Sequence, residues 1–367
     1  MTSTRTSKAS GTGYSLIELM IGSTIMGVMF AGTLVIYVQS HKISTDQMQF
    51  LELQQDVRAA IFHIARDVRM AGAGLPEELA GAALEGVDNE ATDGTETPDR
   101  LRIVGDIEDP MVLRISEVYG STTTAVLENF SFEREPYPDS HYLEKTALLL
   151  PRRGSPCRGA ALRRIVQVLH PPDGLNEGFV FAPGGVPGIS LPGGLADVCL
   201  DEDYRNGGTL LFADIREYWL DVTGNVPGFT AGQDGYVGGG KGGVLYMTRN
   251  GFHYPLAQNV ETLQFQYDGD LDAEPDGRQD GFRDWNGAWT PDQIGRIRQV
   301  RIMVLGRSPD VFASIGKTPV AGQHLYRRPA VANTAAYAAD DWHRRFLMES
   351  TSGLRNLSLN IYNTGIR

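Results

Sequence analysis

The feature that most constrains this chain is an apolar run near its N-terminus. Residues 19 to 38 contain no charged side chain, and about 20 apolar residues are enough for a helix to cross a hydrocarbon core roughly 30 Å thick. We therefore expect a transmembrane helix over residues 14–38. Arg5 and Lys8 precede it and no acidic residue does, so the positive-inside bias keeps the N-terminus in the cytoplasm and exports the part of the chain beyond the helix.

One carboxylate interrupts the start of this run. Glu18 lies within the first turns of the expected helix, where an unpaired acid is costly in lipid and by default indicates a partner or a function. Further along, Ser23, Gly27 and Ala31 repeat at four-residue spacing. This spacing is typical of a ridge of small residues that lets helices approach closely. It is equally explained by the ordinary tolerance of membrane helices for glycine.

The helix is expected to continue past the membrane. Apolar residues recur in steps of three, four and seven, which places them on one face of an amphipathic helix; they are Ile43, Phe50, Val57, Ile61, Ile64 and Val68. A continuous helix from Tyr14 to about Met70 would extend roughly 85 Å at 1.5 Å per residue. Gly72, Gly74 and Pro76 then end it, so residues 39–71 form an amphipathic stem.

The remaining sequence has the composition of a folded, exported domain. Hydrophobic residues make up 41% of the chain, while 43 Gly and 19 Pro indicate many turns and long loops. We expect residues 101–367 to form one β-rich head domain without a clear second domain. Residues 72–100 are acidic and short of large apolar side chains, which predicts an exposed, flexible connection. The predicted fold class is α+β: a long N-terminal α-helix packed on an antiparallel β-sheet with long loop insertions.

Alternating apolar and polar residues predict half-buried antiparallel strands in several separate patches. The clearest are Thr262–Tyr267 and Leu357–Ile361. The others are Leu101–Val104, Met111–Ile115, Thr146–Leu150, Arg164–Leu169, Leu210–Leu220, Val244–Thr248 and Arg298–Leu305. The Gly- and Pro-rich segments 171–208, 223–243 and 268–296 are predicted as loops.

The charge balance argues against broad binding to nucleic acid. The chain carries 45 acidic and 33 basic residues, and from residue 14 onward its net charge falls from −12 to −14. Acidic chains repel polyanions such as nucleic acids and anionic membranes. Arginines gather at positions 152, 153, 158, 163 and 164 and at 327, 328, 344 and 345. We interpret them as solvated faces or ion pairs rather than as phosphate contacts.

Two cysteines, Cys157 and Cys199, lie in the exported part. An oxidising compartment favours pairing, and two cysteines allow one intramolecular bridge. The bridge would close a loop of about 42 residues and stabilise the fold by roughly 3 to 4 kcal/mol. The alternative is two separate buried thiols.

The strongest candidate for a metal site is an acidic loop. Counting from Asp272, acids occupy positions one, three, five and nine with Gly277 at six, as in an EF-hand calcium loop. Position twelve is Arg283, however, and the flanks are strand-like. Two interpretations stay open, a calcium (Ca2+) site or a solvated acidic hairpin loop, and no other cofactor is expected. The acids of the loop are Asp268, Asp270, Asp272, Glu274, Asp276, Asp280 and Asp284.

No arrangement typical of an enzyme is present in the sequence. Residues 235–242 imitate a P-loop, but Gly242 stands where Ser or Thr should hold magnesium. The seven histidines lack metal-ligand spacing, and no Gly-x-Ser-x-Gly elbow occurs. Trp285 and Trp289, near the acidic loop, fit either a sugar-binding surface or structural aromatics. We therefore predict a protein that is not an enzyme.

The N-terminal residues resemble a known family. Gly13-Tyr-Ser-Leu-Ile-Glu-Leu-Met20 is similar to the class III leader of type IV prepilins and pseudopilins. It departs from the usual motif in having Tyr14 where Phe is commoner, and the span lacks the proline that often kinks major pilins. Four further segments look like those of PilW-like minor pilins; they are residues 67–72, 259–267, 300–308 and 354–356.

This resemblance implies a role for each N-terminal residue. A prepilin peptidase cuts after Gly13, which removes the leader 1–13, and methylates the new terminus at Tyr14. Glu18 then pairs with the N-terminal positive charge of a neighbouring subunit, which lowers the free-energy cost of an unpaired carboxylate in lipid. The implied partners are other major and minor pilins, the peptidase and the inner-membrane assembly platform.

The resemblance also implies a location and a function. The chain is expected to be a minor pilin with one span in the inner membrane and an extracytoplasmic head, later incorporated into a type IV pilus at the cell surface. The large head favours a place in the priming or tip complex that initiates assembly. Two alternatives stay open: a pilus-tip adhesin, or a J-class pseudopilin of type II secretion.

Overall fold

A computed structural model of the chain describes a long helix and two β-structured units. The described residues are 14–75, 81, 83–88, 98–105, 107, 111–120, 123–128, 138–143, 145–157, 160–170, 177–182, 199–221, 243–249, 252–308, 329–333 and 344–354.

One helix, α1 (Leu16–Met70), forms the N-terminal part of the described chain. It begins after Ser15, which is extended and whose Oγ accepts the Ile17 N–H. It ends before Gly72 and Gly74, whose φ angles of 74° and 73° lie in the left-handed region that favours glycine. The predicted continuous helix and its glycine stop are therefore confirmed. At 1.5 Å per residue, α1 is roughly 83 Å long.

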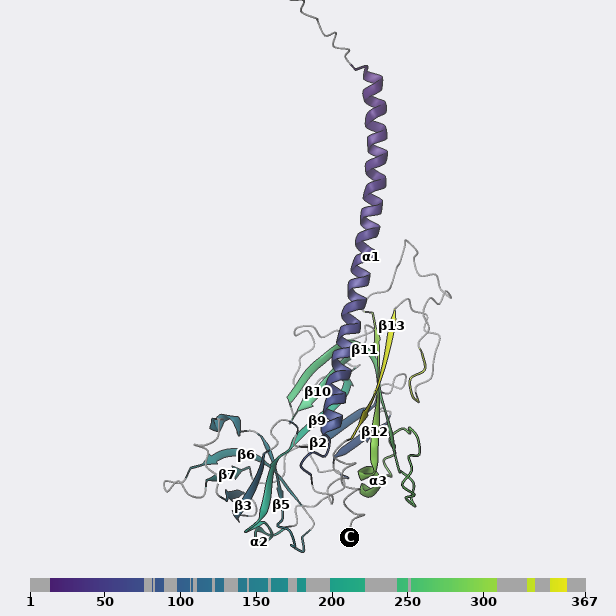
Figure 1. The fold of residues 1–367 in the computed structure, drawn as a ribbon. Coiled ribbons are helices and arrows are strands. Elements are labelled where there is room, and N and C mark those ends of the chain that lie inside the picture. Colours follow the sequence, from purple (N-terminus) through teal and green to yellow (C-terminus); the bar gives the residue numbers. More distant parts are fainter. Residues whose placement is uncertain are drawn as a thin grey trace, which may run out of the picture.

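The C-terminal half of α1 packs on the head, whereas the N-terminal half projects away from it (Figure 1). Leu53, Val57 and Ile64 belong to the buried core, together with Ile61 and Val68. Every residue from 14 to 45, by contrast, is exposed. The predicted apolar face thus contacts the head only from about Phe50 onward, and Ile43, which the sequence places on that face, is exposed.

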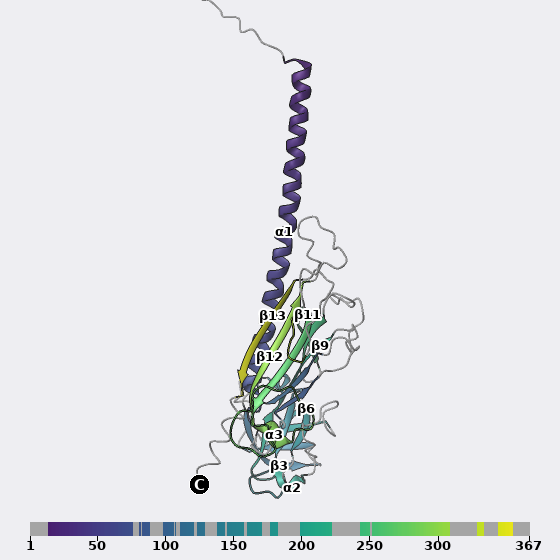
Figure 2. The same ribbon diagram turned by 90° about the vertical axis from the view of Figure 1, so that its right-hand side faces the viewer.

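Seven antiparallel strands form the sheet that carries α1, in the order β1-β2-β9-β10-β11-β12-β13. The stem contacts β11, β12 and β13 (Figures 1 and 2). Val300, Ile302 and Val304 of β12 join the core beneath the helix, because a strand directs every second side chain to the same face. The strands are β1 (Leu84–Val87), β2 (Arg100–Gly105), β9 (Asp214–Asp221), β10 (Gly243–Arg249), β11 (Phe252–Gly269), β12 (Ile297–Arg307) and β13 (Arg345–Gly353).

Six further strands close into a separate barrel in the order β3-β4-β7-β6-β5-β8. The barrel has its own apolar core, in which Tyr142, Phe179 and Phe212 pack with ring centroids 5.6 to 5.9 Å apart. Its strands are β3 (Val112–Tyr119), β4 (Thr124–Leu127), β5 (Thr146–Leu150), β6 (Ala161–Leu169), β7 (Gly178–Phe181) and β8 (Gly208–Phe212). Short helices are η3 (Asp139–His141) and α2 (Asp201–Tyr204) in this unit and α3 (Pro291–Gly295) between β11 and β12.

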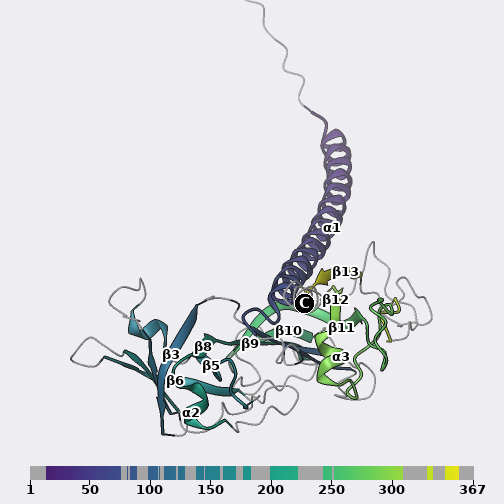
Figure 3. The same cartoon turned by 60° about the horizontal axis from the view of Figure 1, so that its bottom comes forward.

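The barrel lies beside the sheet (Figure 3) and is an insertion between two neighbouring strands of that sheet, β2 and β9. β2 ends at Gly105 and β9 begins at Asp214, and these two residues pair with each other. The chain therefore leaves the sheet and returns to it at adjacent positions. At this junction Val104 and Ile215 share an apolar cluster with Leu148 of the barrel.

Most of the predicted strands are confirmed, but one is wrong as a single element. The apolar run Leu210–Leu220 breaks at Ala213, so that β8 belongs to the barrel and β9 to the sheet. The alternation of apolar and polar residues could not reveal the break. Both strands are apolar, and this alternation does not show which of two sheets a strand joins. The predicted strand Leu357–Ile361 lies outside the described residues.

The head differs in two further ways from its prediction. It contains two β-structured units with separate cores, not one sheet with loop insertions. Strands also occur where composition predicted none: β1 lies within residues 72–100 and buries Leu84, while β7 and α2 lie within the predicted loop 171–208. Four-residue strands are too short to show a periodic pattern.

Gly105 marks a close approach between β2 and the end of the stem. A Cβ at this position would lie 2.8 Å from the Met70 carbonyl oxygen and 3.1 Å from the Ala73 nitrogen. We expect Gly105→Val to lower the free energy of unfolding by about 1–3 kcal/mol, because backbone atoms cannot move aside as a flexible side chain can. Chemical denaturation of the full chain in detergent measures the loss. Gly287→Ala, which meets open space, is the control, and equal losses in both variants would contradict the packing argument.

Candidate membrane and assembly segment

The first turn of α1 holds Glu18 against its own chain. Glu18 Oε2 accepts the backbone N–H of Ser15 at 3.0 Å, and Ser15 Oγ accepts the Ile17 N–H at 3.4 Å. This reciprocal pattern is a capping box, which satisfies backbone donors that the start of a helix leaves unpaired. Glu18 Oε1 forms no hydrogen bond or ion pair with a described residue. Sequence reasoning assigned Glu18 only to a contact between subunits, although the Ser-x-x-Glu spacing was a signal for the cap.

The other predicted processing residues are placed only in part. Gly13 and the rest of the leader lie outside the described residues. Tyr14 is described, and its side chain is exposed. The prediction that the chain is cut between these two residues stays a prediction.

The N-terminal half of α1 is apolar on all sides and uncovered. An 18-residue window within the helix has a mean hydropathy of 2.0 and none of that window is buried. By length and composition α1 can cross a membrane, as the sequence predicts. A contiguous apolar surface of this size is unusual on a soluble protein and indicates that lipid or other proteins cover it.

The serine and threonine hydroxyls between residues 19 and 38 are already hydrogen-bonded within the helix. Ser23 and Thr24 both donate to the Met20 carbonyl, at 2.9 and 2.8 Å, and Thr33 donates to the Met29 carbonyl at 2.9 Å. These three hydroxyls therefore need no partner from lipid, which cannot accept a hydrogen bond. Glu18 is therefore the costly polar group at the start of this surface.

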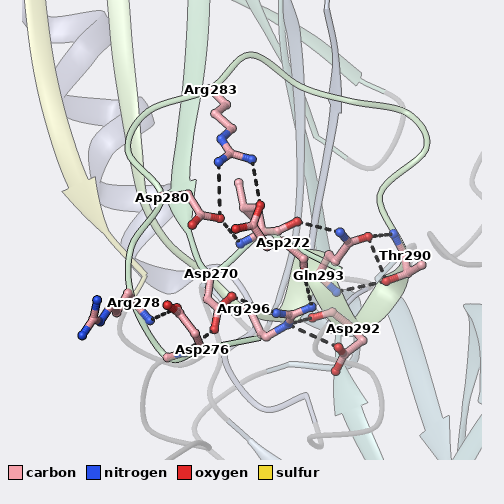
Figure 4. A network of polar contacts seen from close by, with 12 residues as sticks. Asp270, Asp272, Asp276, Arg278, Asp280, Arg283, Thr290, Asp292, Gln293 and Arg296 are labelled. Atoms are coloured by element: carbon pink, nitrogen blue, oxygen red, sulfur yellow. Dashed lines mark hydrogen bonds and ion pairs between the residues drawn. The ribbon is translucent and has the colours of Figure 1, made fainter. Parts of the chain in front are cut away.

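The acidic loop between β11 and β12 is held by hydrogen bonds of its own (Figure 4). Three of its carboxylates accept backbone N–H groups from residues seven or more positions away, which fixes the path of the loop. Asp268 accepts from Gly281 at 3.1 Å, Asp270 from Gly277 at 2.7 Å and Asp280 from Leu271 at 2.8 Å.

Two guanidinium groups compete with a metal for the remaining oxygens. Arg296 Nη1 lies 3.1 Å from Asp270 Oδ1, and Arg283 Nη1 lies 3.4 Å from Asp272 Oδ1. Arg283 is residue twelve of the EF-hand count, so a cation stands where a calcium loop requires an acid. In the part of the chain that the structure describes, no three of the loop carboxylates gather within 4.8 Å of one another.

The other loop acids do not change this picture. Asp276 accepts the Arg278 N–H at 2.9 Å, Asp284 accepts from Gln266 Nε2 at 3.1 Å, and Glu274 is exposed. The contacts favour the structured hairpin over the calcium site.

We expect millimolar calcium to leave the melting temperature of the full chain unchanged. The reason is that the carboxylates of Asp268, Asp270 and Asp280 already have protein donors, and a calcium ion needs six to eight oxygens that face one point. Calorimetric titration and thermal melting test this together. Saturable heat with a raised melting temperature would restore the calcium interpretation.

Cys157 and Cys199 form a disulfide with their Cα atoms 5.6 Å apart, so the predicted bridge is confirmed. It joins the turn after β5 to the residues just before α2. Beside it, Ser155 Oγ donates to Asp203 Oδ1 at 2.7 Å. The bridge therefore fixes the chain just ahead of β8, which closes the barrel.

Two other sequence candidates are structural. Trp285 and Trp289 pack on the buried ring of Tyr267, with centroids 5.1 and 6.1 Å away, which favours structural aromatics over a sugar-binding surface. Arg345 forms a buried ion pair with Glu261 at 2.6 Å, as the ion-pair interpretation predicts. The P-loop imitation and the arginines at 158, 327 and 328 lie outside the described residues.

A buried acid that links stem and sheet was not predicted from the sequence. Asp67 of α1 is 1% exposed, and its Oδ2 accepts Arg216 Nη1 at 2.6 Å and the Tyr218 hydroxyl at 2.5 Å. Both partners are in β9. The available signal was an acid beside Val68 on an otherwise apolar helix face.

Comparisons with known proteins give little beyond this geometry. No protein-family model and no curated protein sequence matches the chain. Among solved structures, a type IV-like pilin from Thermus thermophilus resembles it with 12% sequence identity over 59% of this chain and 87% of the other, at a TM-score of 0.20. A likeness of that size supports no conclusion about function.

Proposed function

We propose that this protein is a pilin-like subunit whose α1 anchors it in the inner membrane and then packs into a type IV pilus. The observation that carries the proposal is the exposed apolar half of α1, which continues without a break into a half packed on a folded head. Such a surface requires lipid or other helices around it. A membrane supplies the lipid, and a filament supplies the neighbouring helices.

Under this proposal the N-terminus is processed before assembly. Prepilin peptidase cuts after Gly13, Tyr14 becomes the methylated terminus, and Glu18 meets the terminal ammonium of a neighbouring subunit. The capping box supports this role, because it holds the carboxylate at the helix start through Oε2 and leaves Oε1 available. An ammonium group beside a carboxylate in an apolar core lowers the cost of both charges.

The head supports a minor rather than a repeating role. It carries a second β-structured unit beside the sheet that seats the stem, and such bulk is easier to place at a few positions than at every step of a filament. We propose a PilW-like position in the priming or tip complex, with other pilins and the assembly platform as partners and no catalytic activity.

Replacing Glu18 tests the proposal. We expect Glu18→Ala to be cleaved normally but to reduce the protein in sheared pili by about tenfold or more, since a hydrogen bond to a charged group contributes about 1.5–3 kcal/mol. Immunoblots of sheared and membrane fractions measure it. Asp46→Ala, an acid of the same helix beyond the span, is the matched control, and Gly13→Ala should block cleavage first. Normal pili from which the wild-type protein is absent would contradict the pilin assignment.

The position of the barrel favours one second function, that of a pilus-tip adhesin. The barrel lies at the end of the head away from the free half of α1 (Figure 1), where an attached surface would be met. Because Gly105 pairs with Asp214, a short linker can replace residues 106–213. The adhesin role predicts normal piliation and lost attachment, and unchanged attachment excludes it. A secretion defect with normal pili would instead favour a pseudopilin.

A further inference from the structure

A second apolar face runs along the stem on the side away from the head. Met48, Leu51 and Phe62 are 60%, 56% and 65% exposed. At 3.6 residues per turn these three side chains lie within about 60° of one another, opposite the buried Val57. Exposed Gln55 lies among them at the same helical spacing, so the second side of the stem presents three large apolar side chains around one amide, and the sheet does not cover it.

This face continues the apolar surface of the span. Phe30, Leu34 and Tyr37 project from the same side of α1 and are all exposed. Lipid covers that upper part, but Met48 begins about ten residues beyond Val38, which is roughly 15 Å further along the helix. The outer face of the stem thus needs a protein to cover it.

Charged residues border the face in two separate groups. Glu52 and Asp56 are one helical turn apart near its upper end, and like charges at this spacing repel each other. Partial burial and the Glu52 carboxylate raise the pKa of Asp56, and neither acid forms an ion pair with a described residue. Arg66 and Arg69 lie near the lower end of the same face and are exposed; Arg66 Nε also pairs with Asp67 Oδ1 of its own helix at 3.3 Å, from a side chain that is half exposed.

We propose that this face binds the same face of a second copy of the chain, with the two helices parallel and shifted by about 14 residues, or roughly 21 Å. A shift of two heptads keeps the same faces together. It sets Phe62 of one copy against Met48 of the other, and Arg66 and Arg69 beside Glu52 and Asp56. Without the shift, like charges would meet.

The geometry of the head permits this contact. The sheet covers the opposite side of the stem, so the two heads point away from each other. The shift is about two thirds of the thickness of a hydrocarbon core of roughly 30 Å, so two copies that both span the bilayer cannot adopt it, and the contact belongs to the assembled filament and not to the membrane. The inference therefore rests on the proposed function, and it specifies two adjacent copies in the priming or tip complex.

Cysteine cross-linking in pili tests the register. One chain carries Met48→Cys and a first tag, and a second chain carries Phe62→Cys and a different tag. Both are expressed together in a strain without the native copy. We expect mixed-tag disulfide dimers in sheared pili at about tenfold excess over dimers that carry a single tag. This is the excess expected if the burial of one large apolar side chain determines the register. Val112→Cys, which is 64% exposed in the barrel, should give none.

The outcomes separate the inference from the proposed function. Absence of the protein from sheared pili contradicts the proposed function. If the protein is present but its mixed-tag dimers do not exceed the others, or if its cysteines link to a different subunit, the inference is overturned and the proposed function stands.

A charge reversal tests the polar border independently. Asp56→Arg or Arg69→Glu alone should lower the mixed-tag cross-link about fivefold, the upper range for an exposed ion pair. A chain that carries both changes should restore the cross-link, because positions 56 and 69 of adjacent copies again carry opposite charges. Failure of the double variant to recover would contradict the proposed register.

Discussion

Asp67→Ala is expected to lower the free energy of unfolding by about 3–5 kcal/mol, because it removes one partner of a buried ion pair and leaves the other buried. The Arg216 guanidinium is 2% exposed and lies in the core between stem and sheet. Burial and the Asp67 carboxylate raise the pKa of Tyr218 far above its ordinary value, so this hydroxyl stays protonated and continues to donate. The carboxylate therefore satisfies two buried donors at once, and alanine satisfies neither.

Denaturation of the full chain in detergent, followed by tryptophan fluorescence, measures this loss. Arg66→Ala is the matched control, since Arg66 contacts the same carboxylate at 3.3 Å from a side chain that is half exposed. An exposed pair contributes about 0–1 kcal/mol. If both variants lose the same free energy, the buried network does not hold the stem to the head.

Replacing both cysteines is expected to cost about 4 kcal/mol. Cys157 and Cys199 are 42 residues apart, and in the chain-entropy model opening a loop of that size restores about this much freedom to the unfolded chain. The bridge holds the residues before α2 close to the turn after β5. We therefore expect Cys157→Ser with Cys199→Ser to loosen β8 first, since this strand closes the barrel against β3 and β5.

Hydrogen exchange and chemical denaturation follow the barrel and the sheet separately. A reductant should destabilise the wild-type barrel and leave the double serine variant unchanged, which controls for effects of reduction elsewhere. Loss of protection in the sheet before the barrel would contradict a local role for the bridge.

The N-terminal helix could be predicted because its signals are local. Charge-free residues 19–38 and the glycines at 72 and 74 determine the helix and its end without reference to the rest of the chain. The strands Thr146–Leu150 and Arg298–Leu305 were found for the same reason. Their alternating or continuous apolar pattern is contained within a few consecutive residues.

The features that could not be predicted depend on distant partners. Asp67 meets Arg216 across 149 positions, and no pattern around either residue identifies the other. The break at Ala213 depends on which sheet each half joins. The acids of the calcium-like loop were counted correctly, but their hydrogen-bond donors come from Gly277, Gly281 and an arginine beyond α3. Spacing alone could not show that these oxygens were already engaged.

The barrel enters and leaves the sheet at Gly105 and Asp214, which are cross-strand neighbours. Insertions, deletions or exchanges between these two positions can therefore leave the register of the seven strands and the seat of the stem unchanged. Sequence changes in the barrel therefore need not affect α1, the helix that has to fit against neighbouring subunits. A lineage of such chains can diversify what it presents to its surroundings while it preserves how it is built into an assembly.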